Sequence, residues 1–85
     1  MKIIFTNHAK VKFKILERHG FKITEAQIKR VIENPASKIH GRKDRLIVQR
    51  PFDDTHMIRV ICEIEENDNI KVITFYPARR DRYES

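Results

Sequence analysis

The residue types best suited to chemistry gather near the end of the chain. The segment from Val72 to Tyr83 reads VITFYPARRDRY, so a strand-like pattern runs into a cluster of arginines bracketed by two tyrosines. A second strand-like segment, Met57 to Glu65, carries one arginine at its centre, Arg59. Because side chains alternate along a strand, pairing of the two segments places Arg59 and Tyr76 on one face of a sheet. Fixed cations beside a phenol are suited to a phosphate-rich polymer.

Histidine, arginine and tyrosine together are sufficient for RNA cleavage without a metal ion. The 2′-hydroxyl attacks the adjacent phosphate, so one group must remove a proton, another must donate one, and a cation must stabilise the phosphorane. Histidine transfers protons at neutral pH, and arginine is a permanent, planar phosphate ligand. His8 is our candidate for proton transfer and Arg59 for the phosphate clamp. Tyr76 would stack on a base or donate a hydrogen bond.

Each of these residues also has a structural interpretation, which stays open at this point. His8 is equally consistent with a residue that caps or packs at the start of a helix. Arg59 is consistent with an ion pair to Glu63 or with an exposed position. Tyr76 is as consistent with packing at the end of the sheet. His40 and His56 fall in predicted loops and receive no assigned role.

A second basic group lies in the middle of the chain and offers a surface for nucleic acid. For this group a solvated loop is an equally available interpretation. Its members are Arg42, Lys43, Arg45 and Arg50.

Length and composition restrict the class of protein. The 85 residues allow one domain, residues 1–85, and 18 Lys and Arg against 12 Asp and Glu give a formal charge of +6 and a pI near 9.8. This excess favours anionic partners, although it is also consistent with charge that only maintains solubility. A single cysteine, Cys62, permits no intramolecular disulfide and points to a reducing compartment. With no signal peptide or spanning segment evident, we expect a cytoplasmic protein without a membrane partner.

Metal and cofactor motifs are not evident. The four histidines are far apart and no Cys-x-x-Cys or His-x-x-x-His pair occurs, so no metal site is expected. With only two glycines, a phosphate-cradling loop is excluded, and no cofactor is expected.

The first half of the chain predicts a short strand followed by two helices. The strand covers Lys2 to Phe5, and Thr6 and Asn7 are capping residues for a helix from about His8 to His19. Thr24 and Gln27 form a capping box for the second helix. Asn34-Pro35 ends that helix, because the residue before a proline avoids helical geometry.

The second half predicts strands. They cover Leu46 to Val48, possibly entered from Lys38-Ile39, then Met57 to Glu65, and Ile70 to Tyr76 ended by Pro77. This order predicts an α+β domain with a short N-terminal strand and a two-helix hairpin packed on one face of an antiparallel sheet of three to four strands. The other face would be partly open.

A turn at Glu66–Asn69 sets the expected pairing of the last two strands. If Glu65 pairs with Ile70, then Val60 faces Phe75, Cys62 faces Ile73 and Arg59 faces Tyr76. The side covered by helices would hold Val60, Cys62, Ile73 and Phe75. The opposite side would hold Arg59, Ile61, Glu63, Val72, Thr74 and Tyr76.

Several short segments resemble known families. Glu17 to Ala26 (ERHGFKITEA), Asn34-Pro35, Ile73 to Arg79 and Tyr83-Glu84 are similar to segments of BrnT-type toxins. Phe5 to Ala9 (FTNHA) resembles an uncharacterised family of small domains that opens with a Thr-x-His-Ala motif. Both groups belong to the RelE/ParE toxin superfamily.

The resemblance implies a RelE-like fold and a ribonuclease toxin of a type II toxin–antitoxin pair, neutralised by a cognate antitoxin. It adds Arg79 and Tyr83 to Arg59 and Tyr76 as site positions, with Arg79 as a second phosphate clamp. With Arg80 and Arg82 added to the basic surface, the expected partners are RNA and an antitoxin, and self-association stays open. The alternatives are a non-catalytic nucleic-acid-binding module and a protein-interaction domain.

Overall fold

The computed structural model of the protein describes residues 2–83, and for residue 83 the backbone alone. The elements, in chain order, are β1 (Ile3–Phe5), α1 (Asn7–Arg18), α2 (Glu25–Glu33), β2 (Ser37–His40), β3 (Arg45–Pro51), β4 (His56–Ile64), the 3-10 turn η1 (Glu66–Asp68), β5 (Ile70–Arg79) and α3 (Arg80–Tyr83).

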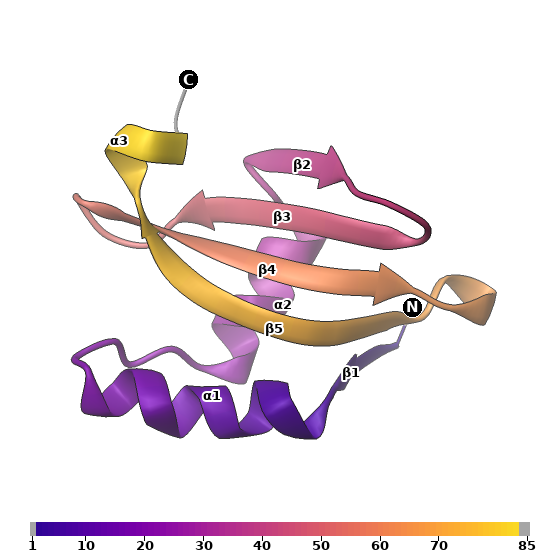
Figure 1. Ribbon diagram of the computed structural model, residues 1–85, viewed down its shortest axis with the longest axis horizontal. Helices are drawn as coiled ribbons and strands as arrows, with labels where there is room; N and C mark the ends of the chain where they lie inside the picture. The colour runs from indigo at the N-terminus through magenta and orange to yellow at the C-terminus, as the bar shows by residue number, and fades with distance from the viewer. Residues whose placement is uncertain (1, 84–85) are drawn as a thin grey trace.

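The strands form one mixed sheet with helices against one side (Figure 1). The strand order is β1-β5-β4-β3-β2, with β1 parallel to β5 and every other pair antiparallel. The predicted α+β class is confirmed, but the sheet has five strands rather than three to four, and it is not wholly antiparallel. The added strands are β1, which joins the edge of β5, and β2, which is a separate strand from β3.

The two long helices connect the two edges of the sheet. The chain leaves β1 at one edge, passes through α1 and α2, and enters β2 at the other edge. Along this path α1 packs on β1 and β5, while α2 packs on β3 and β4. Neither long helix packs on the other side of the sheet, and the short α3 contacts β4 and β5.

Local sequence signals set the helix boundaries. The Thr6 hydroxyl accepts a hydrogen bond from the backbone N–H of Ala9 (3.1 Å), which caps α1. At α2 the capping box of Thr24 and Gln27 forms in both directions. Gly20 has a φ of +90°, a left-handed geometry that glycine adopts without steric cost and that ends α1.

The core lies between the helices and the sheet. Phe75, Ile28, Val48 and Val60 are among its fully buried side chains. Phe13 of α1 stacks against Phe75 with ring centroids 4.6 Å apart, so the first helix is anchored directly to β5. Burial of this apolar surface is the main contribution to the stability of the domain.

The pairing of β4 with β5 contains a bulge that the sequence did not predict. Ile64, not Glu65, pairs with Ile70, and Val72, not Ile73, pairs with Cys62. An extra residue in β5 then restores the expected register, because the ladder shifts between Ile61 and Cys62. Val72 is accordingly fully buried in the core, whereas it was expected on the opposite side of the sheet.

The last strand is also longer than predicted. β5 continues through Pro77 to Arg79, whereas Pro77 was expected to end it. β1 pairs with β5 only as far as Val72, so in the described chain the edge of β5 beyond that residue has no neighbouring strand. Proline is tolerated in an edge strand, where its missing N–H breaks no ladder hydrogen bond.

Candidate functional site

Arg59 and Tyr76 lie together on the side of the sheet away from the two long helices. They are directly opposite each other in the β4–β5 ladder. The Arg59 Nε–H donates a hydrogen bond to the Tyr76 hydroxyl oxygen at 3.1 Å. The expected pairing of these two residues is confirmed, because the bulge between η1 and this pair compensates for the one-residue shift of register at the turn.

Arg59 is nevertheless buried rather than open to a ligand. Its side chain retains 7% of its exposure, and its Nη1 donates a hydrogen bond to the side-chain oxygen of Gln49 at 2.5 Å. Neither structural interpretation of Arg59 is correct, since it is not exposed and Glu63 lies instead 3.9 Å from Arg45. Arg59 therefore acts on its neighbours: because it donates to the Tyr76 oxygen, the phenol must direct its own proton to another acceptor.

Gln49 completes this buried group and was missed in the sequence. It is 4% exposed and pairs with Arg59 across β3 and β4. Strand alternation could have identified it. If the strand that begins at Leu46 continues past Val48, Gln49 lies on the side of the sheet opposite the buried Leu46 and Val48.

A pocket of about 370 Å³ lies at the end of the sheet, beside Tyr76. We call it the strand-end pocket. It straddles the β5 edge that no described strand covers. It is lined by Phe21, His56, Tyr76, Pro77, Ala78, Arg79 and Arg82. The pocket thus combines an imidazole, a phenol and two guanidinium groups, and its volume is within the range of small-molecule sites.

His56 is the histidine that the fold brings to these arginines. It is the first residue of β4 and pairs with Arg79 of β5. Its ring packs edge-on against Phe21, with centroids 4.9 Å apart. The sequence left His56 without a role, and the available signal was its position at the start of a strand whose partner ends in arginines.

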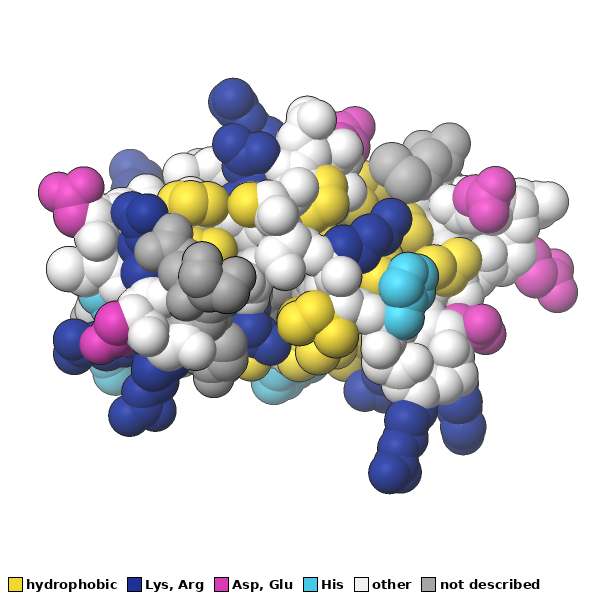
Figure 2. All heavy atoms as spheres, turned by 90° about the horizontal axis from the view of Figure 1, so that it is seen from above, with side chains coloured by type: hydrophobic (Ala, Val, Ile, Leu, Met, Phe, Trp, Pro, Cys, Tyr) yellow, Lys and Arg dark blue, Asp and Glu magenta, His cyan; other side chains and the backbone are white. Residues whose placement is uncertain are grey.

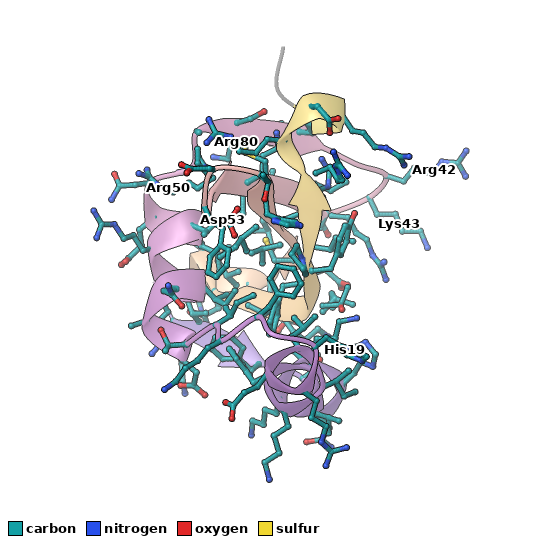
Figure 3. The ribbon with its side chains drawn as sticks, turned by 90° about the vertical axis from the view of Figure 1, so that its left-hand side faces the viewer. His19, Arg42, Lys43, Arg50, Asp53 and Arg80 are labelled. Carbon is teal, nitrogen blue, oxygen red and sulfur yellow. The ribbon has the colours of Figure 1, made fainter. Side chains whose placement is uncertain are left out.

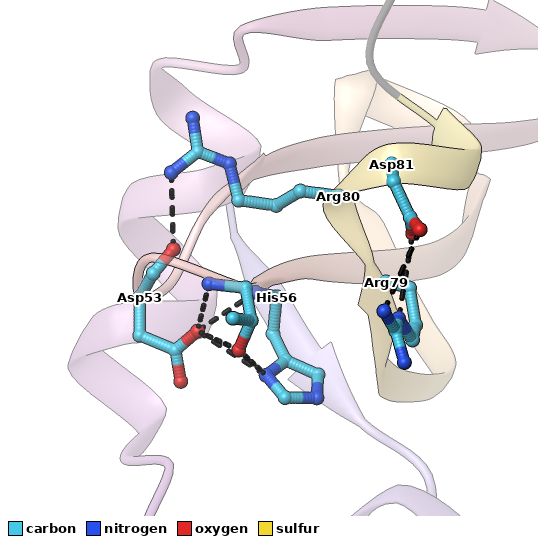
Figure 4. A network of polar contacts seen from close by, with 6 residues as sticks. Asp53, His56, Arg79, Arg80 and Asp81 are labelled. Carbon is cyan, nitrogen blue, oxygen red and sulfur yellow. Dashed lines mark hydrogen bonds and ion pairs between the residues drawn. The ribbon is translucent and has the colours of Figure 1, made fainter.

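A tight turn before β4 orients the His56 ring (Figure 4). The Asp53 carboxylate accepts hydrogen bonds from the backbone N–H groups of Thr55 (2.9 Å) and His56 (2.7 Å). Both hydrogen bonds stabilise the ionised carboxylate and lower the pKa of Asp53 from its ordinary value of 3.8, and the bond from Thr55 has the larger effect. The same carboxylate oxygen lies 3.2 Å from His56 Nδ1. The Thr55 hydroxyl oxygen lies 2.8 Å from the same Nδ1.

The terminal arginines take three different positions. Arg79 is exposed and forms an ion pair with Asp81 (3.4 Å). The Arg80 guanidinium donates to the backbone oxygen of Asp53 (3.1 Å), which fastens α3 to the turn before β4 (Figure 4). Arg82 lines the strand-end pocket. Tyr83 ends α3, and its side chain lies outside the part that the structure describes.

His8 is not brought to this group. It is exposed in the first turn of α1. Thr6, two residues before it, donates to the backbone oxygens of Val72 and Ile73, near the beginning of β5. His8 therefore lies on the helix side of the sheet, whereas Arg59 and Tyr76 lie on the other side.

The second basic group does not form a single surface. Arg42 and Lys43 occupy the β2–β3 hairpin and extend away from the molecule, while Arg50 lies at the other end of β3 (Figure 3). Arg50 donates to the backbone oxygen of Asn34 at the end of α2. Arg45 lies beside Glu63. Only Arg42 and Lys43 thus match the expected solvated loop.

Charge is distributed unevenly between the two ends of the sheet. Acidic side chains concentrate at the end that carries η1, where Asp44, Glu63, Glu65 and Glu66 surround one hollow (Figure 2). The strand-end pocket with its arginines lies at the opposite end.

Two further properties concern metals and membranes. Among the described residues, no group of three or more His, Cys, Asp or Glu side chains is placed to hold a metal ion. No helix within residues 2–83 has both the length and the apolar character that a membrane crossing requires.

Comparison with known proteins assigns the chain to a family. Residues 5–77 match the family described as "Domain of unknown function (DUF4258)", and the chain belongs to it. The match begins at Phe5, the first residue of the FTNHA segment. No curated protein and no solved structure matches the chain.

Proposed function

We propose that the protein is a metal-independent endoribonuclease, the toxin of a type II toxin–antitoxin pair, related to the BrnT-like branch of the RelE/ParE superfamily. The observation that carries this proposal is the strand-end pocket, where His56, Tyr76, Arg79 and Arg82 meet. The resemblance of several short segments to BrnT-type toxins and the net charge of +6 also support it.

The side chains of the pocket match the needs of phosphodiester cleavage. Arg79 and Arg82 are permanent cations that bind phosphate oxygens and stabilise the charge of the phosphorane. Tyr76 accepts a hydrogen bond from Arg59, so its own O–H is directed elsewhere and is suited to donate to the departing 5′-oxygen. Arg59 contributes through Tyr76 rather than by touching the substrate.

The experiment that tests the proposal is digestion of a mixed-sequence RNA in the presence of a chelator. We expect cleavage by the native protein, leaving 2′,3′-cyclic phosphate ends. Arg79→Ala should reduce the rate about 10- to 100-fold, the equivalent of one lost hydrogen bond to a charged group. Arg42→Ala, a change at an exposed arginine of the β2–β3 hairpin, is the matched control and should leave the rate within about twofold.

Intact RNA after incubation with native protein, together with normal growth of cells that express it, would contradict the toxin proposal. A toxin of this kind requires a partner that neutralises it. Its expected partner is an acidic antitoxin, and the expected site of action is the cytoplasm.

The alternative is a non-catalytic module that binds nucleic acid. The burial of Arg59 favours it, because an arginine enclosed by Gln49 and Tyr76 cannot contact a phosphate directly. Salt-sensitive RNA binding without cleavage would support the alternative. In that case arginine substitutions in the pocket would weaken binding, whereas a change at His56 would leave it unaltered.

A further inference from the structure

We propose that His56 removes the proton from the 2′-hydroxyl of the substrate, and that Asp53 and Thr55 fix its ring so that Nε2 is the atom that accepts the proton. This inference rests on the proposed ribonuclease function and identifies its proton-transfer group. It replaces His8, which does not line the strand-end pocket.

The three short contacts at the turn select one tautomer of the imidazole. Asp53 Oδ1 lies 3.2 Å from both the Thr55 hydroxyl and His56 Nδ1, and these two atoms lie 2.8 Å apart. An ionised carboxylate only accepts, so a hydrogen on Nδ1 can be shared with the two oxygens while the Thr55 hydroxyl donates to Asp53. The opposite tautomer would set the lone pair of Nδ1 against the carboxylate. The neutral ring therefore keeps its lone pair on Nε2.

The ring is fixed by packing as well as by hydrogen bonds. Phe21 contacts it edge-on, and the His56 side chain retains 28% of its exposure. Figure 4 shows the second ring nitrogen directed away from Asp53. Since His56 lines the strand-end pocket, its accessible nitrogen is offered to a ligand bound there.

The elements next to His56 carry several charged groups. Arg79 of β5 is the cross-strand partner, and Arg82 of α3 lines the same pocket. Asp81 neutralises part of the Arg79 charge, and Arg80 contacts the backbone of Asp53. The connection between α1 and α2 contributes Phe21, which carries no charge. Arg79 and Arg82 are the cations of the pocket, and Asp53 is the anion in contact with Nδ1.

The step balances with the groups present. His56 Nε2 takes the proton of the 2′-hydroxyl while that oxygen bonds to phosphorus. The bond from phosphorus to the 5′-oxygen breaks, and the leaving oxygen takes the proton of Tyr76. Water then returns the proton from His56 to Tyr76. The products are a 2′,3′-cyclic phosphate and a free 5′-hydroxyl.

The test compares His56→Gln and Asp53→Asn with the control His40→Gln, a change at an exposed histidine of β2. For His56→Gln we expect a 10²- to 10⁴-fold loss of kcat/KM for RNA, the usual contribution of a proton-transfer group.

Asp53→Asn tests the positioning role separately. The asparagine oxygen can still accept from the backbone N–H groups of the turn, so the fold is retained. Removal of the charge should lower kcat/KM by up to about fivefold, as expected for loss of an exposed ion pair. Nitrogen-15 NMR should show the hydrogen of the neutral His56 ring on Nδ1 in the native protein.

The outcomes separate the two proposals. If native protein cleaves RNA but His56→Gln is as active as His40→Gln, the role of His56 is wrong and the ribonuclease function stands. A neutral ring with its hydrogen on Nε2 would overturn the assignment in the same way. If native protein cleaves no RNA, both proposals fail.

Discussion

Replacing Arg59 by alanine should destabilise the domain strongly, although the residue is charged. Arg59 is 7% exposed and Gln49 is 4% exposed, so the substitution removes a buried hydrogen bond to a charged group. A bond to a charged group contributes about 1.5–3 kcal/mol, and an unsatisfied buried group costs about 1–3 kcal/mol. We expect a loss of about 3 kcal/mol in the free energy of unfolding. A domain of 85 residues has roughly 4–13 kcal/mol in total.

Thermal unfolding followed by circular dichroism measures this loss. A decrease of about 3 kcal/mol corresponds to a fall in Tm of roughly 12–24 °C for a domain of this size. Arg45→Ala is the control, because the Arg45 side chain is 53% exposed and its 3.9 Å ion pair with Glu63 should contribute at most about 1 kcal/mol. Equal Tm changes in the two variants would refute the reasoning. RNA cleavage by Arg59→Ala must be measured well below its own Tm, since unfolding alone would abolish activity.

Three further predictions concern other parts of the chain. Thr24→Ala removes the capping box of α2 and should cost about 1 kcal/mol in denaturant unfolding, and an unchanged midpoint would contradict the role of the cap. The pKa of Asp53 is lowered from 3.8, so its ionised form favours folding above that pH and this contribution is lost as the pH falls through the folded-state pKa. The Tm of the native protein should therefore fall more steeply with decreasing pH than the Tm of Asp53→Asn. Parallel curves of Tm against pH would count against this linkage. Burial raises the pKa of Cys62 to about 11, so a thiol reagent should label it only after unfolding, whereas rapid labelling of folded protein would show that the site is open.

The helices could be predicted because their signals are local. Thr24 and Gln27 are three residues apart and bond to each other's backbone, and the geometry of Gly20 follows from its missing side chain. The β4–β5 pairing was partly predictable for the same reason. Alternation fixes which residues share a side of a strand, so Arg59 and Tyr76 could be placed together.

The sequence by itself thus determined the α+β class and the two helices, which follow from short-range periodicity and local capping signals. Only the tertiary structure decided that β1 pairs with β5, that β5 contains a bulge, and that His56 rather than His8 meets the arginines. These depend on contacts between segments far apart in the chain. No local pattern specifies which strand edges meet, because this is decided by the packing of the whole core.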